Sequence, residues 1–274
     1  MLQLLALMVV SGCTNEAKLP EPSAVVAGSA PEVVSALVPA SGVTLEGGAL
    51  VLNTAKGPMK VFPVYHSTTR IEAGGLVIWL DPWSKAALDG AAKADVVLIT
   101  DTHFDHLDKD ALAKVVKEGT VFVAPQTVKD GLPEYVVNHV LANGAEVAIG
   151  DLTVKAVPMY NLVRGPAEGG VYHEKGRGNG YVLMYGGKSV YFAGDTECTD
   201  EMKAQVGMDL AFLPMNLPYT MTTDEAAACV NVFRPAVVVP YHYAGSDLAS
   251  FKAGVTAPGV RVEIVEYYPG GLPW

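Results

Sequence analysis

Four side chains that are able to bind a metal ion are crowded into six residues, Asp101-Thr102-His103-Phe104-Asp105-His106, directly after the apolar run Val96–Thr100. An uninterrupted apolar run of this length is typical of a strand that is covered on both faces. Carboxylates and imidazoles so close together at the end of a buried strand repel one another or lack partners unless a cation joins them. The segment alone also fits a polar loop with an Asp cap and two surface histidines.

Three further candidate ligands favour the metal site over the polar loop. Asp195 ends a hydrophobic stretch, and Gly194 before it permits the close approach of a ligand. His242 lies just past the apolar run Ala236–Pro240, and His173 precedes a glycine-rich stretch. Side chains at strand ends are where layered folds build their sites, so these residues are expected to join the first four.

From residue 46 onward, short apolar runs alternate with turn signals, which predicts more strands than helices. Asp108 is expected to cap a helix that runs to Glu118, and Thr222 with Glu225 has the form of a capping box that opens a helix to Phe233. This order indicates a layered α/β domain with helices outside two sheets. The predicted strands are Ala49–Asn53, Met59–Tyr65, Leu76–Leu80, Asp95–Thr100, Thr120–Ala124, Val147–Ile149, Thr153–Val157, Tyr181–Tyr185, Ser189–Ala193, Asp209–Pro214, Ala236–Pro240 and Val260–Tyr267.

The order of the candidate ligands resembles the metallo-β-lactamase superfamily, over about residues 46–268. The stretches 173–182, 192–196 and 213–243 are similar to the branch that contains ascorbate-6-phosphate lactonase and N-acyl-phosphatidylethanolamine phospholipase D. His66 and Asp81-Pro82 match the early His and the strand-ending Asp-Pro of that branch. The resemblance implies a four-layer αββα sandwich of the α/β class that acts as a metal-dependent hydrolase.

The resemblance also implies two divalent metal ions. Site one would be formed by Asp101, His103 and His173, and site two by Asp105, His106 and His242, with Asp195 bridging them. The family usually has His where this chain has Asp101. A carboxylate in place of an imidazole favours manganese or iron more than the usual ligand set does, but zinc is expected first.

Such a centre implies hydrolysis by a metal-bound hydroxide. Two cations about 3.5–4 Å apart lower the pKa of a bridging water, and the hydroxide attacks a carbonyl or phosphoryl centre. Asp105 is the predicted catalytic residue, because in this family that position contacts both metal and water.

Substrate-binding residues are predicted in three places. Asn161 and Arg164 precede His173 in a loop, where the guanidinium suits an anionic group of the substrate. Asn216 lies beyond the strand 209–214, and Tyr243 is beside His242. For all four, an ordinary role in a loop or in packing remains the alternative.

Two further residues are expected to support the site. His66 is interpreted as a histidine that contacts the ligands and does not bind metal itself. Asp81 is expected to organise the site in the same way.

The first twelve residues form an apolar run that ends at Cys13. A helix that crosses a bilayer needs about 20 residues, whereas the run has the length of a signal-peptide hydrophobic region. Val10-Ser11-Gly12-Cys13 resembles the bacterial lipobox, so Cys13 is predicted to be lipidated, although no Lys or Arg precedes the run. A buried N-terminal helix or strand that ends in a chance cysteine is the alternative.

Residues 13–45 contain recurring prolines and are predicted to be a flexible tether to the domain at 46–274. We therefore expect a protein that is anchored in the bacterial cell envelope and faces the periplasm. Thr14 and Asn15 are not the Asp that retains lipoproteins at the inner membrane, which favours the outer membrane.

Charge and cysteine content narrow the choice of partners. A net charge of −10, with 19 basic against 29 acidic residues, weighs against nucleic acid as a main partner. It also favours neutral substrates. Cys198 and Cys229 are expected either to pair or to remain buried thiols.

The function predicted from these residues is hydrolysis of a small or lipid-derived ester, lactone or phosphodiester at the cell envelope. The alternative is a catalytically degenerate lipoprotein that binds a metal ion or a ligand, in which Asp101 marks the loss of the original site.

Overall fold

The computed structural model describes residues 42–272. The predicted signal peptide, the lipidation site Cys13 and the tether up to residue 41 lie outside these residues. The first strand begins at Val43, so the folded part starts at least three residues before the predicted boundary at 46. In the part of the chain that the structure describes, no helix has the length and hydrophobicity needed to cross a bilayer.

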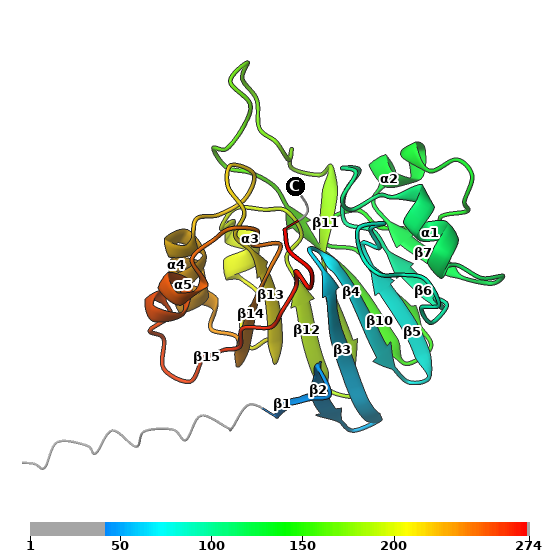
Figure 1. The fold of residues 1–274 in the computed structure, drawn as a ribbon, viewed down its shortest axis with the longest axis horizontal. Coiled ribbons are helices and arrows are strands. Elements are labelled where there is room, and N and C mark those ends of the chain that lie inside the picture. The colour runs from blue at the N-terminus through cyan, green and yellow to red at the C-terminus, as the bar shows by residue number, and fades with distance from the viewer. Residues whose placement is uncertain (1–41, 273–274) are drawn as a thin grey trace, which may run out of the picture. The chain divides into compact units, whose positions relative to one another are not determined.

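Two mixed sheets form the centre of the domain (Figure 1). The first has its eight strands in sequence order, antiparallel from β1 to β5 and parallel from β5 to β8. These strands are β1 (Val43–Glu46), β2 (Ala49–Thr54), β3 (Gly57–Tyr65), β4 (Thr68–Ala73), β5 (Leu76–Leu80), β6 (Val96–Leu98), β7 (Val121–Ala124) and β8 (His139–Val140).

The second sheet has seven strands in the order β15-β14-β13-β12-β11-β10-β9. Its strands are antiparallel from β9 to β12 and parallel from β12 to β15. They are β9 (Glu146–Ile149), β10 (Leu152–Met159), β11 (Gly178–Tyr185), β12 (Lys188–Phe192), β13 (Leu210–Pro214), β14 (Val237–Tyr241) and β15 (Arg261–Val262).

Within residues 42–272, five helices lie outside the sheets (Figure 1). Helices α1 (Lys109–Val115) and α2 (Gln126–Gly131) are on the side of the first sheet. Helices α3 (Asp200–Lys203), α4 (Thr223–Phe233) and α5 (Leu248–Gly254) are on the side of the second. This arrangement confirms the predicted α/β class and the αββα sandwich.

Two hydrophobic clusters hold the layers together. In the larger one, apolar side chains of both sheets pack face to face, for example Leu52 and Ile78 of the first sheet with Phe192 and Phe212 of the second. In the smaller one, the other face of the second sheet packs on its helices through residues such as Phe233. The two sheets are therefore joined by a continuous apolar core, and their edges carry the loops described below.

The capping residues in the sequence predicted the start of two helices correctly. The Asp108 carboxylate accepts hydrogen bonds from two backbone amides of α1, and Thr222 and Glu225 form the complete capping box of α4. The first helix ends at Val115, before the predicted Glu118. The predicted strand Val260–Tyr267 was mostly wrong: only β15 pairs with β14. Farther along, Tyr267 and Tyr268 are buried side chains.

A disulfide joins Cys198 to Cys229, with 5.8 Å between their Cα atoms. It links the segment before α3 to the middle of α4, so the open question about these two cysteines is answered by pairing.

Candidate metal centre

The predicted ligands lie in loops where strands of both sheets end. The segment Asp101–His106 follows β6 of the first sheet, whereas Asp195 follows β12 and His242 follows β14 of the second. His173 lies in the loop between β10 and β11. Because β12, β13 and β14 run parallel, their carboxyl ends meet at one edge of the sheet, which brings Asp195 and His242 together.

Asp101, His103 and His173 form the first cluster able to hold a metal ion. The Nδ1 atom of His103 lies 2.9 Å from Oδ2 of Asp101, and Nε2 of His173 lies 3.9 Å from the same oxygen. Nε2 of His173 is also 3.2 Å from Nδ1 of His103. The structure thus brings together all three residues predicted for site one.

His106, Asp195 and His242 form the second cluster. Nε2 of His106 is 3.4 Å from Oδ2 of Asp195, and Nε2 of His242 is 3.4 Å from Oδ1 of the same carboxylate. The Asp195 Oδ2 atom is also 3.5 Å from Nε2 of His173, so this carboxylate lies between the two clusters. Oδ2 of Asp105 completes the second cluster, 3.4 Å from His242 Nε2 and 3.9 Å from His106 Nε2.

The atoms of the second cluster are spaced as ligands around a cation, whereas two contacts of the first cluster, His103–Asp101 and His173–His103, are at hydrogen-bond distances. Ligand bonds of about 2.0–2.1 Å in a tetrahedral zinc site place neighbouring ligand atoms about 3.4 Å apart. Nε2 of His106, Nε2 of His242 and Oδ1 of Asp195 are buried and have no hydrogen-bond partner. Unsatisfied polar atoms are costly inside a protein, so the residues present fit a bound divalent metal.

Buried contacts behind His106 aim its ring into the second cluster. Its Nδ1 atom lies 2.8 Å from Oδ2 of Asp81, and Thr100 donates to both oxygens of that carboxylate. Burial acts to lower the pKa of His106, but the carboxylates of Asp195, Asp105 and Asp81 outweigh burial and raise this pKa well above its usual value. The cluster therefore has the negative potential that attracts a cation.

Asn161 holds His173 from behind in a similar way. The Asn161 side-chain oxygen accepts from the backbone N–H of His173 and lies 2.7 Å from its Nδ1. Burial lowers the pKa of His173 to about 4, which keeps the ring in the neutral form that binds metal.

Asp101 has a partner that the sequence did not reveal. Nε of Arg177 lies 3.0 Å from Oδ1 of Asp101, and Nη2 donates to Oδ2 at 3.2 Å and to the hydroxyl of Thr102. Burial acts to raise the pKa of Asp101, but His103, His106 and Arg177 outweigh burial and lower it. The Asp101 carboxylate of the first cluster is thus already paired with the guanidinium group of Arg177.

The four predicted substrate-binding residues occupy different surroundings. Asn216 lines the pocket beside the clusters, whereas Asn161 faces His173. Arg164 is paired with Glu225 at 2.6 Å and with Glu197 at 3.5 Å. The Tyr243 hydroxyl donates to the Val265 carbonyl and accepts from a backbone amide. Contact of any of the four with a substrate stays a prediction.

A pocket of about 460 Å³ opens onto both clusters. On its outer side lie the exposed side chains of Phe104, Leu217 and Tyr219, which are 72%, 53% and 43% exposed. The residues that line the pocket are His103, Phe104, Asp105, Tyr172, His173, Asp195, Asn216, Leu217, Pro218, Tyr219 and His242. None of these described lining residues is Lys or Arg, so the pocket combines acidic and imidazole groups with an apolar rim.

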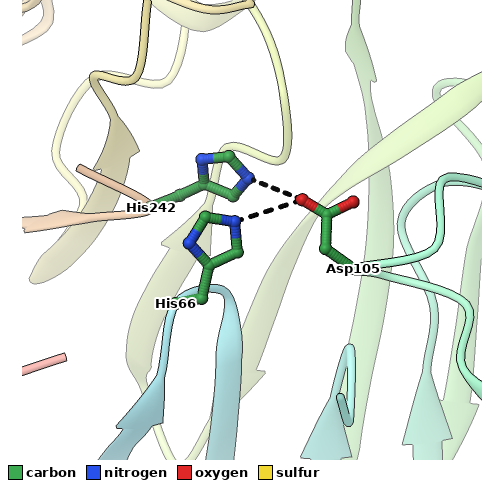
Figure 2. Close-up of side chains that lie close together, drawn as sticks. All are labelled: His66, Asp105 and His242. Carbon is green, nitrogen blue, oxygen red and sulfur yellow. Dashed lines mark hydrogen bonds and ion pairs between the residues drawn. The ribbon is translucent and has the colours of Figure 1, made fainter. Parts of the chain in front are cut away.

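His66 lies beside the second cluster and forms a third group with Asp105 and His242. Figure 2 shows the rings of His66 and His242 facing the same carboxylate oxygen of Asp105, and Nε2 of His66 is 3.1 Å from it. Burial acts to raise the pKa of Asp105, but His106, His242 and His66 outweigh burial and hold it well below its usual range. The sequence prediction that His66 contacts a ligand matches this position.

The sequence of this chain is similar to a known domain family and to several curated proteins. Residues 63–242 match the model of the β-lactamase superfamily domain. A UPF0173 metal-dependent hydrolase of Pyrobaculum calidifontis is 32% identical over 229 residues, which cover 76% of this chain and 96% of the relative. A similar relative from Ignicoccus hospitalis is 31% identical over 220 residues, with 73% and 92% of the two chains covered.

Two solved structures extend the similarity. A putative metal-dependent hydrolase from Parabacteroides distasonis is 35% identical and superimposes with a TM-score of 0.74, covering 79% of this chain and 97% of that one. A metallo hydrolase from Ignicoccus hospitalis is 26% identical, with a TM-score of 0.62 and coverage of 76% and 95%. The chain therefore belongs to the metallo-β-lactamase superfamily and, within it, to the family of UPF0173 metal-dependent hydrolases.

Proposed function

We propose that this protein hydrolyses a small neutral ester or lactone at the paired metal clusters. The pocket is the observation that carries the proposal: its apolar rim and its lack of Lys or Arg among the described lining residues suit an uncharged substrate. A phosphodiester would place its negative charge beside Asp105 and Asp195 with only the metal ions to balance it. Of the two enzymes named in the resemblance above, the lactonase supports this class, whereas the phospholipase D would fit a phosphodiester.

Two divalent metal ions are proposed, one held by Asp101, His103 and His173 and the other by Asp105, His106 and His242. Asp195 lies between the clusters and is proposed to bridge them. Zinc is proposed first, with manganese or iron as alternatives because of Asp101. When bound, these ions supply an acidified water and a Lewis acid for the substrate carbonyl.

Asp105 is proposed to take the proton of the attacking water. Its carboxylate lines the pocket and is ionised at neutral pH, as a group that accepts a proton must be. Its contacts with His66, His106 and His242 all end on Oδ2. We therefore assign the proton transfer to Oδ1.

The test combines metal content with turnover. Full-length protein is assayed on panels of nitrophenyl esters, lactones and bis(nitrophenyl) phosphate, before and after chelation and after zinc, manganese or iron is returned. We expect ester or lactone turnover that is lost on chelation and restored by one metal. Asp105→Asn should lower kcat by about 10²–10⁴-fold, whereas the exposed control Asp151→Asn should not. Turnover that survives complete metal removal would contradict the proposal.

The alternative is a catalytically degenerate protein that binds metal or a ligand without turnover. The ion pair between Arg177 and Asp101 favours it, because the guanidinium competes with a metal ion for that carboxylate. Metal bound at the second cluster, with no turnover on any panel, would support this function.

Anchoring at the cell envelope through Cys13 remains part of the proposal. It is supported by the lipobox-like sequence at residues 10–13. In a bacterial host, wild-type protein should sediment with the membrane fraction, and Cys13→Ala should release it. If wild type and Cys13→Ala were divided equally between the membrane and soluble fractions, the proposed anchor would be contradicted.

A further inference from the structure

His66 connects the candidate catalytic carboxylate to the C-terminal segment of the domain. The ring lies in the turn between β3 and β4 and is fully buried. Nε2 lies 3.1 Å from Oδ2 of Asp105, and Nδ1 lies 2.7 Å from the hydroxyl oxygen of Tyr268. The second contact joins residues 202 positions apart, so only the complete fold makes it.

The direction of each hydrogen bond follows from the surrounding donors. The backbone N–H of Ala244 donates to the Tyr268 hydroxyl oxygen at 3.0 Å. The Asp105 carboxylate can only accept, so Nε2 of His66 carries a hydrogen, and a neutral ring then accepts the Tyr268 hydroxyl hydrogen at Nδ1. His66 therefore donates to Oδ2 of Asp105 through Nε2.

The hydrogen on Nε2 distinguishes this role from metal binding. Nε2 of His66 approaches Asp105 Oδ2 to 3.1 Å, a hydrogen-bond distance for a nitrogen donor and a carboxylate. Nε2 of His242 stays 3.4 Å from the same oxygen, at the spacing of two ligands around one ion. A nitrogen that carries a hydrogen has no lone pair for a metal, so His66 stands behind Asp105 and outside the ligand set.

We propose that Tyr268 and His66 form a positioning relay that fixes the Asp105 carboxylate, with Oδ2 held among the histidines and Oδ1 left to accept the proton of the water. The proposal rests on the proposed function in one respect, the proton transfer to Asp105. The relay runs from the Ala244 amide through Tyr268 and His66 to Asp105, and Tyr268 is itself nearly buried.

The experiment uses three variants of full-length protein and one matched control. His66→Ala removes the donor, and His66→Gln keeps an N–H donor near the place of Nε2. Tyr268→Phe removes only the hydroxyl group that orients the ring. Tyr267→Phe is the control, because it removes the neighbouring buried hydroxyl, which bonds to Thr69.

Three readouts are expected. His66→Ala should lower kcat by about 10–100-fold and Tyr268→Phe by about tenfold, with KM unchanged, as is typical when a partner of a site carboxylate is removed. His66→Gln should recover most of the loss, and Tyr267→Phe should match wild type. Metal content by elemental mass spectrometry should equal wild type in all four. Nitrogen-15 NMR of histidine-labelled wild type should show His66 protonated at Nε2.

Two results would overturn the relay. Loss of a metal ion in both His66→Ala and His66→Gln would make His66 a ligand, and a hydrogen on Nδ1 instead of Nε2 would reverse the hydrogen bonds. Wild-type protein with no turnover on any substrate would contradict the proposed function instead. In that case the NMR signal and the metal content still decide whether the relay exists.

Discussion

The rings of His66 and His242 lie 3.7 Å apart between centroids, and the backbone of His242 donates to the carbonyl of His66 at 3.0 Å. Both residues have left-handed backbone conformations, with φ of 58° and 47°. Such conformations are unfavourable for residues with a side chain and cost on the order of 1–3 kcal/mol each when the surroundings impose them. The two turns therefore hold each other in a strained arrangement that points both rings at Asp105 (Figure 2).

Replacing Asp81 should weaken metal binding without removing a ligand. Its carboxylate orients His106 and is anchored by Thr100. Asp81→Asn should lower the metal affinity by about 10–100-fold. Competition with a chromophoric chelator measures the change, with the exposed Asp89→Asn as control. Equal affinity in the Asp81 variant would show that His106 needs no such partner.

Removing the charge of Arg177 should strengthen binding at the first cluster. The guanidinium repels a cation and occupies the Asp101 carboxylate. Arg177→Gln should tighten the weaker of the two zinc-binding steps by at least about tenfold, which corresponds to roughly 1.4 kcal/mol of relieved repulsion. Isothermal titration of the metal-free protein measures both steps. Weaker binding would mean instead that Arg177 is needed to orient Asp101.

The Cys198–Cys229 disulfide should stabilise the folded protein by restricting the conformations of the unfolded chain. It closes a loop with a sequence separation of 31 residues. A loop of this size is expected to contribute about 3–4 kcal/mol to the free energy of unfolding. Urea unfolding of the double Cys→Ser variant, and of wild type under reducing conditions, should show the same loss. A difference between the two would indicate that the serine side chains disturb the packing around α4.

Gly180→Ala should destabilise the second sheet. A Cβ atom there would lie 2.6 Å from the carbonyl oxygen of Ala193 and 2.8 Å from that of Phe192, and neither backbone atom can rotate away. We expect a loss of at least about 1–3 kcal/mol of unfolding free energy. Gly131→Ala is the control, since its new Cβ would meet only a side-chain carbon at 3.6 Å. Thermal unfolding of both variants measures the difference, and only Gly180→Ala should have a lower Tm than wild type.

The sequence predicted the elements whose signals are local. The Thr222–Glu225 capping box and the strand Leu76–Leu80 were located correctly, because capping and continuous apolar runs depend on neighbouring residues. The strand β4 was missed, because Thr68–Ala73 contains only two apolar residues, Ile71 and Ala73, and so has no apolar run. The segment is held as a strand by pairing with its neighbours β3 and β5.

The residues that the sequence named as ligands lie together in the structure, whereas two of the partners behind them, Arg177 and Tyr268, were not predicted. Motif order identified the residues that the structure gathers into the clusters. The pairing of Arg177 with Asp101 joins residues 76 positions apart, and the Tyr268–His66 contact spans 202. No local pattern encodes such distances. For the same reason, the sequence could not decide between a disulfide and two free thiols.

The ligands are divided between the two sheets, and the last of them, His242, comes from β14 near the end of the chain. During synthesis on a ribosome, the segment Asp101–His106 emerges long before His242 exists. A metal ion that arrives early meets only part of its coordination sphere and is easily lost. Stable loading must therefore wait until His242 has been synthesised and both sheets have formed, and the availability of metal in the compartment where folding is completed decides which ion the protein keeps.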